Sequence, residues 1–332
     1  MNVSQVTAAR TLPALRRPDI RVLAAFAAIY FLWGATFLAI RIAVLEVPPF
    51  FGSGLRFLIA GAALYAFMRL RGQPAPTPLE WRSIALIALC MFVVTYAALF
   101  WAEQYVPSGV TSVLEATLPV ITVTLEVFVF RQQPFRWRTA LAVTLGFAGV
   151  AWLLVGSGAE TFPALPCVAI LAGATAWSLG AVLTRSLPRP RSLSLAAGAQ
   201  MMVGGVLLLT LSETTGELAS LPHISLRAGA ALAYLVVAGS LVGFTAYVWL
   251  LGRMPASRVA SHAYVNPLVA VALGYFAAGE TLTPGMIVAS ALIVLSVILI
   301  LTVPQDRKSP VVRRSHDNDS AERMACTDTA GS

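Results

Sequence analysis

The chain consists largely of apolar segments, each long enough to cross a lipid bilayer. A transmembrane helix needs about 20 mainly apolar residues, because it rises about 1.5 Å per residue through a hydrocarbon core of about 30 Å. Ten such windows are present, at residues 22–41, 50–68, 83–102, 107–130, 138–155, 163–185, 193–211, 228–250, 257–278 and 284–303. Since a single chain satisfies its backbone hydrogen bonds in lipid most simply as helices, the windows predict an all-α, polytopic membrane protein with ten transmembrane helices.

The composition supports this class of protein. Of the 332 residues, 58% are hydrophobic and 11% are charged, whereas soluble domains contain roughly 25% charged residues. Basic residues gather in cytoplasmic loops of membrane proteins, which explains the net charge of +8 without a nucleic-acid partner. The three cysteines show no CxxC or metal-ligand spacing, and no Walker motif is present. We therefore predict no cofactor, no metal site and no ATP hydrolysis within this chain.

The distribution of charge predicts the orientation in the membrane. Four arginines among residues 1–21 precede the first window, which is too long for the core of a signal peptide and is interpreted as an uncleaved helix. Basic residues then recur at every second link. The alternate links carry the acidic residues Glu46, Glu103, Glu160, Glu213, Glu217 and Glu280. The positive-inside rule therefore predicts cytoplasmic termini, with residues 1–21 as an N-terminal segment and residues 304–332 as a disordered tail.

The two halves of the chain match each other after a shift of 144 or 148 residues. The shift of 144 aligns Trp33 with Trp177, Arg41 with Arg185, Gly54 with Gly198 and Gly61 with Gly205; the shift of 148 aligns Trp101 with Trp249, Pro107 with Pro255 and Pro119 with Pro267. Each half, 22–156 and 163–303, holds five windows, and an odd number inverts the second half in the membrane. Two inverted five-helix repeats are typical of secondary transporters, with chance similarity between apolar helices as the alternative.

These residues are similar to those of the drug/metabolite transporter superfamily, in particular the ten-helix EamA family. The resemblance covers residues of about 25–155 and 165–302. It is carried by Trp33-Gly34, Arg56-Phe57, Pro119, Pro267, Gly279-Glu280 and the tract 260–280; Arg131-Gln132 departs from it, because many members have Gly-Glu there. The resemblance implies a substrate cavity between the halves, peripheral fifth and tenth helices, and export of amino acids, metabolites or drugs.

Several ionisable residues lie inside the predicted helices, where an unpaired charge costs several kcal/mol. Glu115 lies roughly 12 Å into the fourth window, near mid-membrane, and is a candidate for binding a proton or a cationic substrate, or else for a structural ion pair. Arg56 stays charged and faces a cavity, a substrate anion or Glu115. Glu126 lies nearer the cytoplasm, where snorkelling or local pairing explains it; a second proton site is the alternative.

The second half adds further candidate residues. His262 is nearly equivalent to Glu115 and either bridges helices or carries a proton; Tyr264 and Asn266 follow it, and Gln200 replaces Arg56. The predicted substrate- or proton-binding set is Glu115, Arg56, His262, Tyr264, Asn266, Gln200, Trp101 and Trp249. The four tryptophans, Trp33, Trp101, Trp177 and Trp249, have two possible roles. They either anchor helices at the membrane interface or line the cavity. Pro119 and Pro267 are interpreted as hinges or as packing kinks.

Together these features predict a secondary active transporter that exports small metabolites, amino acids or drugs by alternating access. Proton coupling and a homodimer are open options, and the alternative function is a passive channel or lipid scramblase. An intramembrane enzyme is disfavoured because HExxH, GxSxG and paired Asp motifs are absent. The preference for Arg over Lys and the many alanines indicate a GC-rich bacterium. The expected location is therefore a bacterial inner membrane, with a small-molecule substrate and membrane lipids as partners.

Overall fold

The computed structural model describes residues 19–155, 163–220, 224–278 and 284–302. Within these residues every regular element is a helix, which confirms the predicted all-α class. Seven helical stretches are long and apolar enough to cross a membrane: Ile20–Val44, Pro49–Leu70, Pro78–Ala102, Ser108–Val129, Ala164–Ser186, Leu193–Thr214 and Leu226–Leu251. These stretches coincide with seven of the ten predicted windows.

The other three windows also contain helices in the structure. They are α8 (Trp137–Val155), α13 (Ala256–Val259) with α14 (His262–Ala278), and α15 (Pro284–Thr302). That these helices also cross the membrane, giving ten crossings, stays a prediction. The predicted tail at 304–332, nearly all of the N-terminal segment 1–21, and Gly279-Glu280 lie outside the described residues.

Several spans are built from consecutive helical elements. Their order along the chain is α1 (Ile20–Ala27), η1 (Ala28–Leu32), α2 (Trp33–Val44), α3 (Pro49–Leu70), α4 (Pro78–Ala88), η2 (Leu89–Val94), α5 (Thr95–Ala102), α6 (Ser108–Glu115), α7 (Leu118–Thr124), η3 (Leu125–Val129), α9 (Ala164–Ser186), α10 (Leu193–Thr214), η4 (Glu217–Ser220), α11 (Leu226–Tyr234), η5 (Leu235–Phe244) and α12 (Thr245–Leu251). The segments η1, η2, η3 and η5 are π-helical, a form frequent at functional sites. The 148-residue shift places η2 within η5.

Local sequence explains where the helices begin. Thr77 caps α4: its Oγ1 accepts from the Glu80 N–H (3.3 Å), while the Glu80 carboxylate accepts from the Thr77 N–H (2.7 Å). Pro78 and Pro49 occupy the first positions of α4 and α3, where the missing N–H costs no helical hydrogen bond. Ser225 caps α11 by accepting from the third N–H of that helix (3.2 Å).

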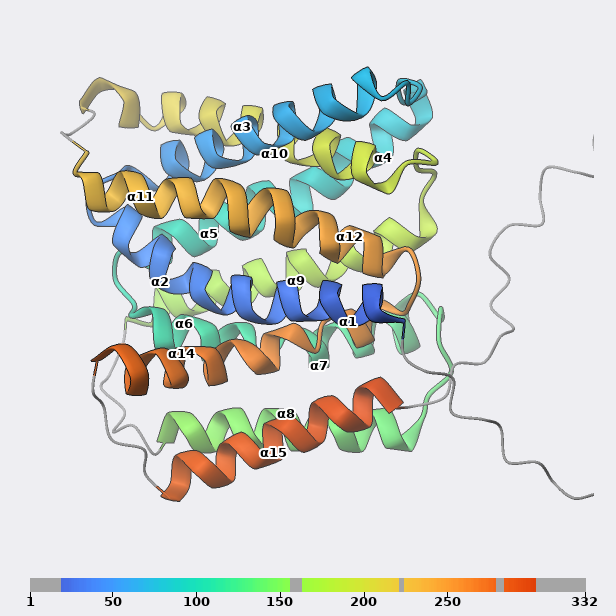
Figure 1. The fold of residues 1–332 in the computed structure, drawn as a ribbon, viewed down its shortest axis with the longest axis vertical. Helices are drawn as coiled ribbons and strands as arrows, with labels where there is room; N and C mark the ends of the chain where they lie inside the picture. Colours follow the sequence, from blue (N-terminus) through green and yellow to red (C-terminus); the bar gives the residue numbers. More distant parts are fainter. Residues whose placement is uncertain (1–18, 156–162, 221–223, 279–283, 303–332) are drawn as a thin grey trace, which may run out of the picture. The chain divides into compact units, whose positions relative to one another are not determined.

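The helices α3 and α10 pack against each other more extensively than any other pair that the structure describes (Figure 1). They run antiparallel, and glycines allow their backbones to meet. A Cβ atom added at Gly61 would lie 2.3 Å from the Met202 amide nitrogen, and one added at Gly205 would lie 2.4 Å from that of Leu58. Small residues let transmembrane helices approach closely, so these glycines determine the spacing between the two helices.

The glycine contacts follow the 144-residue shift. For each pair of matching glycines, the residues they contact also match. Gly54 contacts Leu209 and Gly198 contacts Tyr65, while Gly61 contacts Met202 and Gly205 contacts Leu58. The two helices therefore present the same face to each other in opposite directions.

The helices α8 and α15 lie together at the edge of the helical unit opposite to α3 and α10 (Figure 1). The Ser296 hydroxyl of α15 donates to the Ala142 carbonyl of α8 (2.6 Å). Tyr264 of α14 donates to the Val143 carbonyl of the same helix (2.9 Å). This position agrees with the peripheral fifth and tenth helices that the resemblance implies. The helices between the two edges surround the cavity described next.

Candidate functional site

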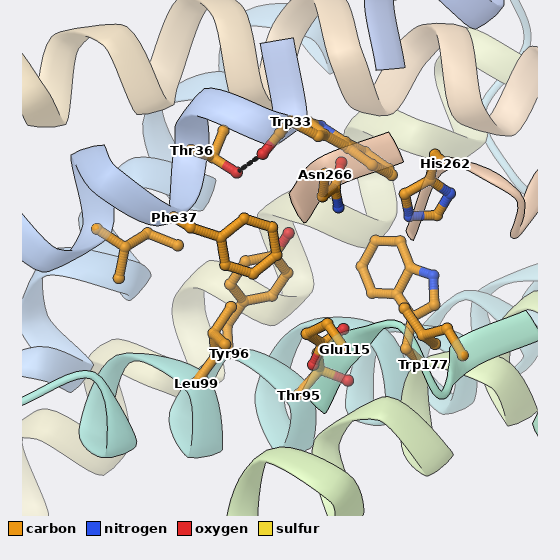
Figure 2. A pocket seen from close by; sticks show the side chains of 12 residues that line it. Trp33, Thr36, Phe37, Thr95, Tyr96, Leu99, Glu115, Trp177, His262 and Asn266 are labelled. Atoms are coloured by element: carbon orange, nitrogen blue, oxygen red, sulfur yellow. Dashed lines mark hydrogen bonds between the residues drawn. The ribbon is translucent and has the colours of Figure 1, made fainter. Parts of the chain in front are cut away.

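A narrow cavity of about 40 Å³ lies among helices from both halves of the chain. This volume holds roughly three water molecules. Its lining consists of Trp33, Thr36, Phe37, Ile40, Thr95, Tyr96, Leu99, Glu115, Leu118, Trp177, His262 and Asn266. In Figure 2, Trp33, Thr36 and Asn266 lie above this space, and Thr95 and Glu115 lie below it. The site thus combines aromatic rings with a carboxyl, an imidazole and an amide group.

Two tryptophans that match at the 144-residue shift form part of the cavity wall. Trp33 of α2 and Trp177 of α9 meet edge to face, with ring centroids 5.5 Å apart. The Trp33 indole N–H donates to the Gly239 carbonyl (2.9 Å), and that of Trp177 donates to the Tyr247 hydroxyl (2.9 Å). Because both polar edges are satisfied, the rings are held in place. The wall can therefore receive an apolar or cationic group without rearranging.

Glu115 is the acidic group of the cavity. It is the last residue of α6, directly before a break in the fourth window that ends where α7 begins. Its side chain is 6% exposed, and Oε1 has no hydrogen-bond partner among the described residues. An unsatisfied acceptor in a buried site is costly and is relieved by a proton, a cation or a polar ligand. The structure therefore brings Glu115 to the cavity with capacity to bind.

His262 and Asn266 reach the same cavity from α14. The His262 Nδ1 lies 3.0 Å from the Val259 carbonyl, which only accepts, so Nδ1 carries a proton and Nε2 is the acceptor of the neutral ring. The imidazole packs against the Trp33 ring at 4.9 Å. Asn266 lies one turn further along, and its buried Oδ1 has no partner among the described residues. Both side chains can therefore offer an acceptor to a bound molecule.

Arg56 is buried behind the cavity wall and does not line it. Its Nε donates to the Ser240 hydroxyl of η5 (2.8 Å). Its guanidinium carbon lies 5.0 Å from the ring centroid of Tyr96, which does line the cavity. Arg56 thus contacts Ser240 and Tyr96 rather than Glu115, and its charge reaches the cavity through Tyr96.

The same segments that build this cavity match a known family. The model of the EamA-like transporter family matches residues 20–155 and 164–302. The chain belongs to the EamA-like transporter family. The recognition of the drug/metabolite transporter superfamily from the sequence is confirmed, and the family indicates a membrane transporter rather than an enzyme.

Relatives of this EamA-like transporter carry names of the same kind. It is 35% identical over 276 residues to "Uncharacterized inner membrane transporter YedA" of Escherichia coli (strain K12), covering 82% of this chain and 88% of that protein. It is 27% identical over 275 residues to "Probable amino-acid metabolite efflux pump" of Salmonella typhimurium, covering 80% and 89%. A solved crystal structure shares the fold, with a TM-score of 0.68 at 22% identity over 87% of this chain and 100% of that one.

Four of the predicted site residues lie away from the cavity of this EamA-like transporter. Tyr264 is directed towards α8, as described above, and Gln200 is buried in α10 with its Oε1 unpartnered among the described residues. Trp101 packs on Tyr105 at 5.4 Å, at the end of α5. The Arg253 guanidinium covers the face of Trp249 at 3.5 Å. A direct role in binding stays a prediction for each of them.

The two prolines interpreted as hinges occupy different environments. Pro119 is at the start of α7, immediately after the break that follows Glu115. Pro267 lies inside the continuous helix α14, whereas the break in that window falls at residues 260–261, between α13 and α14. Proline is tolerated in the first turn of a helix but removes a hydrogen bond in its interior. The structure therefore places Pro119 beside a break and Pro267 inside a continuous helix, and a hinge role stays a prediction for both.

Glu126 is held by a long-range contact, whereas its sequence position suggested snorkelling or local pairing. It is buried, and its Oε1 accepts from the Ala256 N–H (2.7 Å) while Oε2 accepts from the Ser257 N–H (3.1 Å) and the Ser257 hydroxyl. The carboxylate thus caps α13. Because Glu126 belongs to the first half and α13 to the second, this contact joins the two halves.

Sequence reasoning missed part of the cavity wall. The sequence placed Trp101 and Trp249 in the predicted binding set and left out Trp33 and Trp177, whereas the structure has Trp33 and Trp177 in the cavity wall. Tyr96, in the third span, carried no signal of its own. Glu103 was assigned to a link, yet its side chain is fully buried. The repeat identifies matching positions, but it does not say which side of a helix faces the cavity.

Proposed function

We propose that this chain is a secondary transporter that exports small molecules bearing an amino group, such as amino acids, related metabolites or amine drugs. The observation that carries the proposal is the buried Glu115 carboxyl, which lines the cavity together with Trp33 and Trp177 and whose Oε1 has no partner among the described residues. A carboxylate pairs with an ammonium group, and indole faces attract cations and cover apolar surface. Removal from water makes both interactions stronger than they are at a protein surface.

The proposal includes two inverted five-helix repeats as the moving parts. It is supported by two separate family matches in one chain and by the matching glycine contacts of α3 and α10. A further pair of contacts obeys the repeat: Arg41 donates to the Glu103 carbonyl, and Arg185 donates to the Leu251 carbonyl (3.3 Å). Glu103 and Leu251 match at the 148-residue shift. In transporters with such repeats, one half rocks against the other around a central site.

Carboxylates that cross between the halves support alternating access. Glu46 accepts from the Ser225 N–H and hydroxyl, both at 2.9 Å. Glu217 accepts from the N–H groups of Phe50 (3.2 Å) and Phe51 (2.8 Å) at the start of α3. In the predicted topology these two contacts lie at the outer end and the Glu126 contact at the cytoplasmic end. Each of these contacts joins the two halves. The outer end can therefore open when the Glu46 and Glu217 contacts separate, and the cytoplasmic end when the Glu126 contact separates.

Competition for Glu115 provides a way to couple export to protons. A protonated carboxyl group does not pair with an ammonium group, so proton and substrate occupy Glu115 in turn. Entry of a proton from outside then releases the amine, and loss of the proton to the cytoplasm prepares the site for the next one. His262, on the opposite repeat, is the second candidate proton carrier. The proposal places the chain in a bacterial inner membrane, which the name of the relative YedA supports. Both termini lie in the cytoplasm in this proposal, because basic residues recur at every second link.

The test replaces Glu115 by glutamine. Cells that overproduce the protein are first screened for resistance to toxic amino-acid analogues, amines and cationic dyes. The compound that shows resistance is then assayed in proteoliposomes, where we expect saturable flux that rises with an imposed proton gradient. In Glu115→Gln this dependence should disappear, because the amide neither binds a proton nor carries charge.

The matched control is Glu213→Gln, the same change at an exposed carboxylate at the end of α10. This variant should transport like the unmodified protein. Unchanged gradient dependence in Glu115→Gln refutes the coupling role. Flux that never saturates and needs no gradient supports the passive-channel alternative.

A further inference from the structure

A second carboxyl group is buried close to the cavity, and the function described above does not use it. Glu103 directly follows the span Pro78–Ala102 and is 0% exposed. Both of its carboxyl oxygens lack a hydrogen-bond partner among the described residues. Leaving two acceptors unsatisfied is costly, and fully buried acids without partners are rare. Such a group calls for an explanation other than packing.

The helical register places Glu103 on the face of its helix that lines the cavity. Thr95, Leu99 and Glu103 follow each other at intervals of four residues, and the first two line the cavity. On α2, Phe37 lines the cavity and Arg41 lies four residues beyond it. Residues four apart share a helix face and differ by about 6 Å along the axis. Glu103 and Arg41 therefore lie one turn beyond the cavity lining, towards the link that follows α5.

The second repeat has an apolar residue at the position equivalent to Glu103. Its counterpart of Glu103 is Leu251, which is 1% exposed and receives the equivalent hydrogen bond from Arg185 at its carbonyl. An apolar side chain therefore suits the surroundings, and the arginine contact to the backbone does not depend on a carboxyl group. Both repeats thus share the buried position and the arginine contact to the backbone, and the carboxyl group of Glu103 is present in the first repeat alone.

Two charged groups act on Glu103, Arg41 from α2 and Glu115 from α6. Of the other titratable groups nearby, Cys167 of α9 belongs to the apolar cluster that contains Ala102, and Arg56 of α3 lies against Tyr96. Burial raises the pKa of Glu103 well above its usual range, the Arg41 guanidinium opposes this, and the Glu115 carboxylate raises the pKa further. The two acids thus influence each other, so that the charge state of one affects proton binding by the other.

We propose that Glu103 is a further proton-carrying residue of this transporter and exchanges protons between Glu115 and the water outside the link after α5. In this relay the Glu103 carboxyl gives its proton to the Glu115 carboxylate through hydroxyl groups or water in the cavity. Glu103 then takes a proton from the outside water, and no other bond changes. Arg41 stabilises the ionised form of Glu103 that exists between these two steps. The proposal rests on the transport function described above.

The experiment is an infrared pH titration of the purified protein in lipid nanodiscs, with protons as the only ligand. The C=O stretch of a protonated carboxyl group is distinct from the carboxylate bands. We expect the unmodified protein to keep a protonated-carboxyl band far above about pH 4.3, the ordinary midpoint of glutamate. The share of this band that comes from Glu103 should vanish in both Glu103→Gln and Glu103→Leu, whereas the share from Glu115 should remain. In Glu115→Gln the Glu103 share should remain, with its midpoint lowered because the neighbouring carboxylate no longer raises it.

Several controls keep this test decisive. Glu103→Leu reproduces the residue of the second repeat and should elute as a folded protein, so a missing band reports the lost acid rather than misfolding. Glu103→Asp should restore a titrating band, and Glu213→Gln should change nothing. A band that keeps its full intensity in Glu103→Gln, or a Glu103 midpoint that is unchanged in Glu115→Gln, overturns the relay. Neither result depends on flux, so failure of the transport assay is recognised separately.

Discussion

Replacing Gly61 by alanine tests whether the close contact of α3 and α10 is essential to the helical unit. The new Cβ would lie 2.3 Å from the Met202 amide nitrogen and 2.8 Å from the Met201 carbonyl carbon, whereas ordinary contacts begin near 3.4 Å. The obstructing atoms are backbone, so no side-chain rotation relieves the clash. The helices must therefore separate by about 1 Å. Overpacking typically costs about 1–3 kcal/mol, and we expect the upper part of this range, about 2–3 kcal/mol.

The assay is unfolding in mixed detergent micelles, followed by tryptophan fluorescence and by elution of the folded protein. The matched controls are Gly109→Ala in α6 and Gly229→Ala in α11, where an added Cβ meets no atom within 4 Å. Alanine favours helix over glycine by about 1 kcal/mol, so both controls should be as stable as the unmodified protein or more stable. Gly61→Ala should be the least stable of the three.

The repeat counterpart extends this prediction. Gly205→Ala places a Cβ 2.4 Å from the Leu58 amide nitrogen and should cost about as much as Gly61→Ala. The double variant should cost less than the sum of the two, because one separation of the helices relieves both clashes. If Gly61→Ala is as stable as the controls, the helices do not pack at the described distance and this reasoning is wrong.

Two further predictions concern carboxyl groups. Glu126→Gln replaces one oxygen that accepts from the α13 amides with an N–H donor, and should lower the free energy of opening α13 by about 2 kcal/mol. Amide hydrogen–deuterium exchange at Ala256 and Ser257 should then accelerate about 30-fold. Unchanged exchange would contradict the capping role. Because the pKa of Glu103 is raised in the folded protein, its contribution to stability is present below about pH 4.3 and is lost as the pH rises through the folded-state pKa. Glu103→Leu should therefore melt at a higher temperature than the unmodified protein at pH 8, with the difference shrinking towards pH 4; a constant difference would refute this.

The sequence alone identified three of the ionisable and polar residues that line the cavity. Glu115, His262 and Asn266 could be found because ionisable and amide groups are conspicuous in apolar windows and because the repeat aligns the first two. The tryptophans could not be sorted in this way. Trp33 and Trp177 face the cavity, whereas Trp101 and Trp249 do not. All four are matched and apolar, so only the packing of the helices distinguishes them.

Long-range contacts account for much of what the sequence did not reveal. The break in the ninth window falls at residues 260–261 rather than at Pro267, after the short helix α13 that Glu126 caps from 130 residues away along the chain. Glu103 lies at the end of a hydropathy window, which suggests a link, yet the surrounding helices cover it completely. Neither fact can be read from local composition, because each depends on which helix lies beside which.

One departure from the family pattern has a local explanation in the backbone. Arg131 stands where many members have glycine, and its φ is 50°, in the left-handed region that glycine adopts without strain. The backbone at the end of η3 thus retains the conformation that suits glycine although the residue has changed.

The contact between Trp33 and Trp177 has a consequence for how turnover can be observed. These two residues match each other in the repeat and also touch each other, so a two-fold operation that exchanges the repeats maps their contact onto itself. If the repeats exchange conformations as proposed, the contacts of Arg41 and Arg185 trade places, whereas Trp33 and Trp177 remain partners of each other. The indole pair is then the stationary point of the proposed cycle. The distance between a pair of labels placed on either side of this indole pair should stay constant during turnover. Label pairs at the two ends of the cavity should report distance changes of opposite sign.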